Sequence, residues 1–565
     1  MADDDGYSWE REDTHFPDRM SRWGAELFMT RQSRGIAEIC ADTGFLFDEV
    51  RTAEIDGWAY ATVVPLGGKV RRPPPNWLVP LLVRIVPDLR RRIATMRNLE
   101  RTNYWEGVVD SWLSGDEDAL LADGVAILDT DPSGLSDGEL ADLLAETWTY
   151  AERAVKKHFH LHGAGINEIM RLSMVLNREH GFTTAELSGL LTGLSDTTTG
   201  PAAAQAEIID LIRANDGEPT LRTATSLDTV RAIAPEVDAA ITRYMASWGR
   251  RAIRYEIAYP TIAESPEWVL DILRSQIDRP SAAELADRHR DTRSNVEHRV
   301  LAALGDTEET RARIERARRA FPIREGNEAA TVGVPAAALR HVGQEAGRRL
   351  AASDHLDDAG HVFDALPAEV DAVLRGHADP GLATRALDRH TERLSPVTSP
   401  PPRTKGPELA LPDLSGFPDD IQEAVESVLW FSSKASTIQT GIADADDVAT
   451  SAADESASAS TIVGMGVAPG TYEGPARIVL DETGFDKIEP GDVLVCPITS
   501  PVWSMLFPSL GALVCDNGGP LSHPAIIARE FGIPAVVATD DATTALVDGQ
   551  PIRVDGAAGT VVAIG

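Results

Sequence analysis

The chain contains 565 residues, which is too long for one ordinary hydrophobic core, so the sequence predicts a multidomain protein. Its formal net charge of −35 at pH 7 would repel nucleic acids and anionic membranes, and we expect neither as a partner. The three cysteines are too few for a disulfide framework or a thiolate metal site, which favours a cytoplasmic location.

The N-terminal and central parts of the chain have the pattern of helices. Residues 1–19 form an acidic segment that begins Met-Ala-Asp-Asp-Asp and lacks the basic and then apolar pattern of a signal peptide. Residues 20–394 mix apolar and charged side chains at helical spacing, for example over 137–157 and 283–304, and few stretches alternate as strands do. The sequence therefore predicts one mostly α-helical domain over 20–394.

Three histidines alternate within this helical region. His158, His160 and His162 lie in the run from Lys157 to Gly163. On a helix His158 and His162 would share a face while His160 points away, whereas on a strand all three would share one side. Alternating imidazoles can bind zinc, but metal sites need further ligands, so we predict no metal and favour a cluster at a helix end. Its functional role would be to bind a substrate and to orient or deprotonate a hydroxyl, because histidine titrates near neutral pH.

Two linkers and one helix follow. Residues 395–412 are rich in proline, which predicts an extended linker. Residues 413–441 contain an amphipathic helix over 419–433, which we expect to pack back on the helical domain. Residues 442–463 are rich in Ala, Ser and Asp and lack apolar periodicity, which predicts a flexible linker. A linker of about 20 such residues reaches on the order of 25 Å, so a domain that it tethers can travel between two sites.

The last segment, residues 464–565, has the pattern of a small α/β domain. The run Asn517-Gly518-Gly519 ends a buried apolar strand. Pro524 fits the first residue of a short helix with His523 as its N-cap, and Gly532 fits the left-handed C-cap. The expected fold class is thus multidomain, mostly α-helical in the N-terminal and central region, with a C-terminal α/β domain.

The residues around His523 suit an anion. Backbone N–H groups and the positive end of the helix dipole favour phosphate at this helix N-terminus, and Gly518 and Gly519 let the backbone approach it. Together with Ser522 they form the predicted phosphate-binding set. A neutral imidazole can attack phosphorus and hold the group as a labile phosphoramidate, so His523 is the predicted catalytic nucleophile. The structural alternative is an ordinary helix-capping histidine in a tight turn.

This segment resembles the phosphohistidine signature of the mobile, or swivelling, domain of the PEP-utilising enzymes. The shared pattern is Gly-Gly, then Ser-His, then Ala-x-x-Ala-Arg-Glu and Gly-Ile-Pro-Ala-Val, which this chain carries from Gly518 to Val536. The run from Gly466 to Gly470 resembles the opening hairpin of the same family. Leu521 stands where many members have Thr, and Pro524 where Ala is usual. The resemblance implies a swivelling phosphohistidine domain over the C-terminal segment.

A second resemblance lies in the helical region. It covers 190–199, 248–251, 255–257 and 260–266, which resemble the substrate domain of rifampicin phosphotransferase-like proteins. The Tyr-Gly-His-Arg of that family becomes Ser-Trp-Gly-Arg-Arg here, so its middle histidine is absent. This resemblance implies that the helical domain holds an acceptor. The nearby charged residues would contact phosphate or substrate, or form a surface ion-pair network, which we prefer; they are Arg250, Arg251 and Glu256.

Full-length members of these families begin with an ATP-grasp nucleotide-binding module or end with a PEP-binding barrel. The sequence has no counterpart of either and no Gly-x-x-x-x-Gly-Lys phosphate loop. Phosphoryl transfer depends on positioning and on charge neutralisation by cations and metal ions. We therefore expect no cofactor on this chain and a separate ATP-grasp subunit that uses ATP and Mg²⁺, with a PEP-using partner as the alternative donor. With ATP, the resemblance implies a pyrophosphoryl intermediate, with AMP and phosphate as by-products.

These expectations describe a phosphotransferase, a kinase-like transferase with ping-pong kinetics. His523 would be phosphorylated by the partner and would pass the group to a hydroxyl of a small organic acceptor held in the helical domain. The alternative is a phosphohistidine carrier or regulatory binding protein without a small-molecule acceptor of its own. A third interpretation is a scaffold that keeps the fold but transfers nothing.

Overall fold

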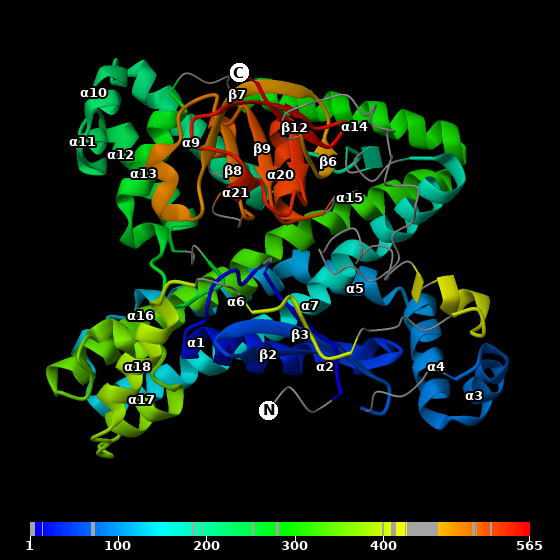
Figure 1. Ribbon diagram of the computed structural model, residues 1–565, viewed down its shortest axis with the longest axis horizontal. Helices are drawn as coiled ribbons and strands as arrows, with labels where there is room; N and C mark the ends of the chain where they lie inside the picture. Colours follow the sequence, from blue (N-terminus) through cyan, green and yellow to red (C-terminus); the bar gives the residue numbers. More distant parts are fainter. Residues whose placement is uncertain are drawn as a thin grey trace. The chain divides into compact units, whose positions relative to one another are not determined.

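The computed structural model describes residues 6–13, 15–68, 74–182, 186–187, 189–194, 196–250, 254–277, 282–397, 401–407, 414–423, 425–426, 461–499, 503, 506–519 and 522–564. The chain divides into two compact units, and it enters each unit more than once (Figure 1). Unit 1 consists of Met1–Gly165, Arg250–Thr261 and Asn327–Val425. Unit 2 consists of Ile166–Gly249, Ile262–Gly326 and Glu426–Gly565. None of the described helices is long and apolar enough to cross a membrane.

Unit 1 contains a four-stranded antiparallel sheet in the order β2, β3, β1, β4. Its strands are β1 (Trp9–Arg11), β2 (Phe47–Ile55), β3 (Trp58–Pro65) and β4 (Thr404–Lys405). Asp56 and Gly57 form the turn between β2 and β3 with φ values of 55° and 86°, as a two-residue hairpin of this type requires. This sheet differs from the expectation of a helical domain with few strands. Strand β2 is half-buried along its whole length, and its sequence lacks the alternation of apolar and polar residues that marks a strand. The Asp-Gly pair was the local signal for this hairpin.

The helices of unit 1 enclose one apolar core. They are α1 (Arg22–Gly24), α2 (Gln32–Thr43), α3 (Val79–Ile85), α4 (Pro87–Arg101), α5 (Tyr104–Ser111), α6 (Glu117–Asp129), α16 (Val334–Ala352), α17 (Pro367–Leu374) and α18 (Leu382–Leu394). Short 3-10 or π segments are η2 (Ala25–Arg31), η3 (Asn76–Leu78), η4 (Trp112–Asp116), η5 (Pro132–Gly134), η8 (Ala329–Gly333) and η9 (Ala359–Asp364). At the core, the rings of Trp23 and Trp148 lie 5.5 Å apart and both are buried. The long helix α7 (Asp137–His180) belongs to unit 1 up to Gly165 and to unit 2 beyond it.

The predicted helix over 419–433 is described only at its start. Ile421 is 2% exposed, and Asp420 pairs with Arg97 of α4 at 2.7 Å between Oδ2 and Nε. This start therefore packs on unit 1. The rest of that helix, most of the predicted linker over 442–463 and parts of the proline-rich linker lie outside the described residues.

The helical part of unit 2 surrounds a second apolar core. Its helices are the end of α7, α9 (Asp196–Ala214), α10 (Glu218–Thr223), α11 (Leu227–Arg231), α12 (Pro235–Tyr244), α13 (Pro266–Ser275), α14 (Ala282–Leu304) and α15 (Glu308–Glu328), with η6 (Met245–Gly249) and η7 (Ile262–Glu264). Leu172, Leu190 and Val300 are fully buried in this core. Gly181 ends α7 with a φ of 68°.

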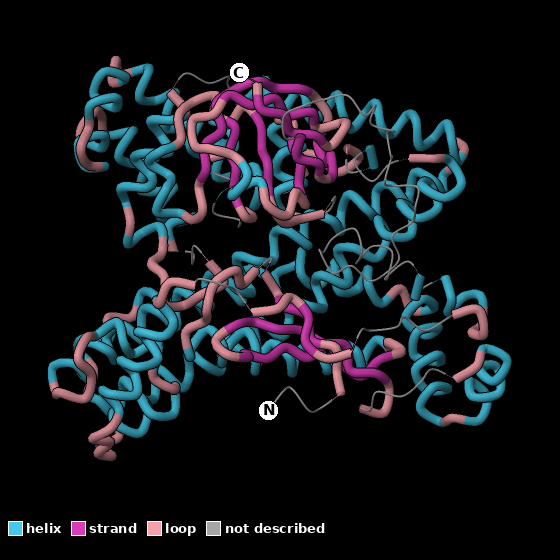
Figure 2. The backbone as a smooth tube through the Cα atoms, viewed as in Figure 1, coloured by secondary structure: helices cyan, strands magenta, loops and turns pink. Residues whose placement is uncertain are grey.

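The C-terminal part of unit 2 is built on an eight-stranded mixed sheet in the order β5, β12, β11, β7, β8, β9, β10, β6, shown in magenta in Figure 2. The strands are β5 (Thr461–Val463), β6 (Met465–Ala468), β7 (Thr471–Ile478), β8 (Val493–Cys496), β9 (Ala512–Cys515), β10 (Ala535–Val537), β11 (Pro551–Asp555) and β12 (Thr560–Ala563). Strands β7 to β10 pair in parallel, and the outer pairs are antiparallel. The helical segments are η10 (Glu482–Lys487), η12 (Phe507–Ser509), α20 (His523–Phe531) and α21 (Ala542–Ala545). The expected fold class, mostly helical with a C-terminal α/β domain, is confirmed.

Candidate phosphohistidine site

His523 is the first residue of α20, which follows strand β9 and a tight turn. The N-cap is Ser522, which has an extended backbone (φ −71°, ψ 159°). Its carbonyl accepts the first helical hydrogen bond, from the Ile526 N–H at 3.0 Å. The predicted N-cap was His523, one residue too late. The error arises from Pro524. Because proline has no backbone N–H and the first N–H groups of a helix have no partner within it, proline fits the second helical position as well as the first.

The end of α20 is as predicted. Gly532 adopts a left-handed conformation with a φ of 64°, and the N–H of Ile533 donates to the carbonyl of Ala528 at 3.0 Å. These two features form the usual glycine-terminated helix end. They limit α20 to nine residues and return the chain to strand β10.

The turn before His523 is held by its own polar groups. Gly518 has a φ of 124°, and a Cβ there would lie 3.0 Å from the Ser522 Oγ, so glycine is required. The Ser522 hydroxyl donates to the Gly519 carbonyl at 2.7 Å and is buried. Of the predicted phosphate-binding set, Gly518 and Gly519 thus shape the turn, and Ser522 closes it from inside. The intervening Pro520 and Leu521 lie outside the described residues.

Asp516 anchors the same turn to the neighbouring segment, and the sequence did not single it out. Its Oδ1 accepts from the Thr543 N–H at 3.0 Å and from the Thr539 hydroxyl at 3.4 Å, and its Oδ2 accepts from the Thr543 hydroxyl. Burial raises the pKa of Asp516. The sequence did contain a signal for this anchor, because Asp516 directly follows a buried strand. An unpaired carboxylate is costly there, so hydrogen-bond partners could have been expected.

Cys515, just before this turn, is a core residue. It is fully buried in β9 opposite Cys496 of β8, with 3.6 Å between the two Sγ atoms. His523 is partly exposed, although its Nε2 atom is buried, and its role as the catalytic nucleophile stays a prediction.

The three alternating histidines lie within α7 of unit 1. The rings of His158 and His162 are 4.2 Å apart, while His160 faces Asp42 with 3.8 Å between Nε2 and Oδ2. His158 Nδ1 and the Thr331 hydroxyl are 2.9 Å apart. The helical arrangement is confirmed, but the prediction of a helix end was wrong. Helix α7 continues to His180 because no glycine with positive φ or proline interrupts it before Gly181.

The charged residues near 250 have two different surroundings. Arg250 pairs with Asp129 at 2.6 Å on the surface of unit 1, as preferred from the sequence. Glu256 is instead buried: its Oε2 accepts from the Ser21 N–H at 2.8 Å, and its Oε1 accepts from the Ser21 hydroxyl and the Ala258 N–H. Burial raises the pKa of Glu256. A surface role for Glu256 was therefore wrong, because the carboxylate serves the start of α1; Arg251 lies outside the described residues.

Comparison with known families gives two matches. Residues 488–559 match the family described as the mobile domain of PEP-utilising enzymes, and this range contains all of α20. The C-terminal part of the chain is thus similar to the mobile domain of PEP-utilising enzymes. A second match, over residues 158–325, is to the family described as the rifampicin phosphotransferase fourth domain. Both resemblances found in the sequence are thereby confirmed.

Curated relatives match the chain over short segments. An uncharacterized phosphotransferase, YvkC, of Bacillus subtilis is 46% identical over 111 residues, 20% of this chain and 13% of its own length. A rifampicin phosphotransferase of Streptomyces sviceus is 47% identical over 100 residues, 18% of this chain and 11% of its own length. A probable phosphoenolpyruvate synthase of Archaeoglobus fulgidus is 33% identical over 149 residues, 26% of this chain and 20% of its own length. The matched segments are thus small parts of these relatives.

Proposed function

We propose that the protein is a phosphotransferase subunit in which His523 carries the phosphoryl group. A separate ATP-grasp or PEP-using partner charges His523, and the mobile domain delivers the group to a hydroxyl of a small organic acceptor bound in the helical region. The observation that carries this proposal is the place of His523 at the N-terminus of α20, after a glycine-dependent turn, inside the mobile-domain match. The match of residues 158–325 to a rifampicin phosphotransferase domain supports an acceptor in the helical region.

The chemistry consists of two displacements at phosphorus. In the first, an imidazole nitrogen of His523 attacks, the N–P bond forms, and the P–O bond to the leaving group of the donor breaks. In the second, the acceptor hydroxyl oxygen attacks the same phosphorus, the N–P bond breaks, and the hydroxyl proton passes to a base. With ATP as donor, attack at the β-phosphorus releases AMP, and water then releases the outer phosphate.

The positive end of the α20 dipole and the backbone N–H groups of its first turn favour the anionic phosphoryl group at this position. The turn residues Gly518 and Gly519 keep side chains away from it. Mg²⁺ and nucleotide would be held by the partner, where Mg²⁺ would neutralise the phosphate charge of the donor.

The test is labelling of the full chain. The protein is incubated with a candidate ATP-grasp protein, Mg²⁺ and ATP labelled at the β-phosphate, and in parallel with labelled PEP and a PEP-using partner. We expect acid-labile label on the wild type and none on His523→Ala. The control His180→Ala, which removes an exposed imidazole at the end of α7, should keep the label.

The outcomes separate the alternatives. Absence of label with every donor would overturn the proposal. Label that a pool of small hydroxyl compounds removes supports the phosphotransferase. Label that no small compound removes, but that a second protein accepts, would instead show a phosphohistidine carrier.

A further inference from the structure

Helix α20 is seated on the helical part of unit 2. Ile526, three residues after His523, is 6% exposed and lies in the apolar core formed by the helical residues. The core residues of that part that share the cluster include Leu187, Leu190, Leu191, Val296 and Phe321. Among the described residues, Ile526 is thus the mobile-domain side chain in a core that the helical part of unit 2 otherwise forms.

A charged contact lies one turn further along α20. Glu530 is 4% exposed, and its Oε2 accepts from the N–H of Gly193 at 2.6 Å. His289 of α14 donates from Nε2 to the carbonyl oxygen of Glu530, and the same nitrogen lies 3.8 Å from Oε2. Burying a carboxylate is costly unless it is paired and hydrogen-bonded, and these contacts supply both.

The loop that Glu530 contacts is held from the other side by two arginines. Arg318 of α15 donates to the carbonyl of Leu190 at 3.4 Å, and Arg293 of α14 donates to the carbonyl of Thr192. Burial lowers the pKa of Arg293, and the charge of Arg318 lowers it further, whereas the charge of Glu530 opposes the change. The Glu530 carboxylate is therefore a counter-charge for Arg293.

The docked face of α20 is also the face that bears His523. His523, Ile526 and Glu530 follow one another at spacings of three and four residues, which on a helix of 3.6 residues per turn places them on one side. A separate donor protein needs that side to reach the imidazole. Docking on the helical part and charging by a donor therefore compete for the same surface.

We propose that Glu530 is a latch that holds α20 on a docking surface formed by Leu190–Gly193, His289 and Arg293, and that this docked arrangement is the acceptor side of the transfer cycle. The latch must open for a donor to charge His523 and must close for delivery to the acceptor. Glu530 is thus a positioning residue. This inference rests on the proposed function, but the latch itself can be measured without donor or acceptor.

The first experiment measures docking alone in the full chain by amide hydrogen exchange. Glu530→Ala should speed exchange of the Gly193 amide by about tenfold or more, the factor that a hydrogen bond to a charged group contributes to an equilibrium. Glu530→Gln keeps the shape and one acceptor oxygen and should restore part of the protection. The matched control is Glu489→Ala, whose carboxylate is 78% exposed in the same domain and should leave the amide unchanged.

The second experiment tests the partner on α14. His289→Ala should speed exchange of the Gly193 amide and raise the rate at which diethyl pyrocarbonate modifies His523, by about tenfold in each case. The control His298→Ala removes an exposed imidazole from the same helix and should change neither rate. Unchanged exchange at Gly193 in both Glu530→Ala and His289→Ala would overturn the latch. Thermal unfolding of each variant identifies loss of the fold, and Glu530→Gln then decides the question.

The third experiment uses the two half-reactions. Opening the latch should raise the rate of label appearance on His523 and lower the rate of its transfer to an acceptor, whereas general damage to the fold lowers both. Equal losses in both half-reactions would contradict the latch. One result would separate the two proposals: His523 takes no label from any donor, while exchange of the Gly193 amide responds to Glu530→Ala. The proposed function and the role of the latch in delivery would then be wrong, but the docking contact itself would be confirmed.

Discussion

The carboxylate of Glu530 and the backbone N–H of Gly193 form a hydrogen bond of 2.6 Å, although 337 positions of sequence separate them. Gly193 has a φ of 69°, and the ring of His289 occupies the space that a Cβ at this position would need. Glycine at 193 is therefore required twice, by backbone conformation and by the approach of His289. The conformation of this loop and the docking of α20 depend on the same residue.

The first prediction concerns Gly193→Ala. We expect a loss of about 1–2 kcal/mol in the free energy of unfolding from the left-handed conformation alone, and a further loss from overlap with His289. Gly181→Ala is the matched control, because Gly181 has nearly the same φ of 68° and open space around a Cβ. Chemical denaturation should show the larger loss for Gly193→Ala. Equal losses in the two variants would show that the contact with His289 is unimportant.

The contrast between α20 and this docking contact shows what the sequence can reveal. The end of α20 was predicted because left-handed glycine and a following proline act locally, at Gly532 and Pro534. The start was misplaced by one residue because a proline fits the first and the second position of a helix equally well. The bond between Glu530 and Gly193 was not predicted, because no local pattern pairs a helix carboxylate with one distant backbone N–H.

The β2–β3 hairpin and the histidine cluster show the same limit. Asp56-Gly57 carried a local turn signal, but the half-buried β2 has no alternating pattern from which a strand could be assigned. For His158 and His162, helical spacing predicted the shared face correctly. Their position in the interior of α7 depends on the length of that helix, which tertiary packing decides more than local propensity does.

The second prediction concerns these histidines and the acceptor. If His158 and His162 orient or deprotonate the acceptor hydroxyl, His158→Ala and His162→Ala should slow the removal of label from His523 by hydroxyl compounds by about a hundredfold. Charging of His523 should be unchanged. His160→Ala is the control on the same helix, because His160 faces Asp42 instead. Equal transfer rates in all three variants would exclude this cluster from the acceptor site.

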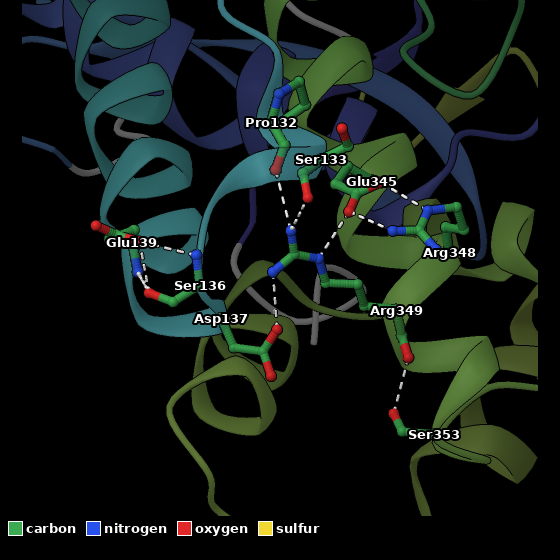
Figure 3. A network of polar contacts seen from close by, with 9 residues as sticks. All are labelled: Pro132, Ser133, Ser136, Asp137, Glu139, Glu345, Arg348, Arg349 and Ser353. Atoms are coloured by element: carbon green, nitrogen blue, oxygen red, sulfur yellow. Dashed lines mark hydrogen bonds and ion pairs between the residues drawn. The ribbon is translucent and has the colours of Figure 1, made fainter.

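The third prediction concerns a polar network that joins α16 to the start of α7 (Figure 3). Arg349 donates to Glu345 at 2.7 Å, to Asp137 at 2.9 Å and to the carbonyl of Pro132 at 3.0 Å. Arg348 is 60% exposed, and within the described part of the chain it bonds to Glu345 of its own helix turn. We expect Arg349→Met to lower the free energy of unfolding by about 2 kcal/mol. Arg348→Met should cost about 0.5 kcal/mol.

This network also predicts a pH dependence. Hydrogen bonds from Arg348, and next from Arg349, hold the pKa of Glu345 below its usual value, against the opposing effect of burial. The stabilisation is therefore fully present above the pKa of the unfolded state and is lost as pH falls through the lower folded pKa. The difference in unfolding free energy between the wild type and Arg349→Met should shrink as the pH falls from about 6 to about 3. This range brackets the usual glutamate pKa of about 4.3. A constant difference would contradict a role for the Glu345 charge.

The last prediction concerns Arg529, the neighbour of Glu530 on α20. Its Nε donates to the carbonyl of Val467 at 2.5 Å, but both Nη atoms are buried and neither has a hydrogen-bond partner in the described part of the chain. Burial lowers the pKa of Arg529 to about 9. Between this value and the higher ordinary pKa of arginine the unfolded state binds more protons, so stability rises with pH in that range, and below pH 9 the buried charge is a net cost.

Replacing Arg529 by Met removes that charge and keeps a long apolar side chain, at the loss of one hydrogen bond to a carbonyl. Because an unpaired buried charge costs more than one such bond contributes, we expect the unfolding free energy at pH 7 to rise by about 1 kcal/mol. The control is Arg553→Met, because the side chain of Arg553 in β11 is 52% exposed. This control should change the unfolding free energy by less than about 0.5 kcal/mol. Urea denaturation of both variants checks this, and a clear loss of stability in Arg529→Met would show that the bond to Val467 outweighs the cost of the buried charge.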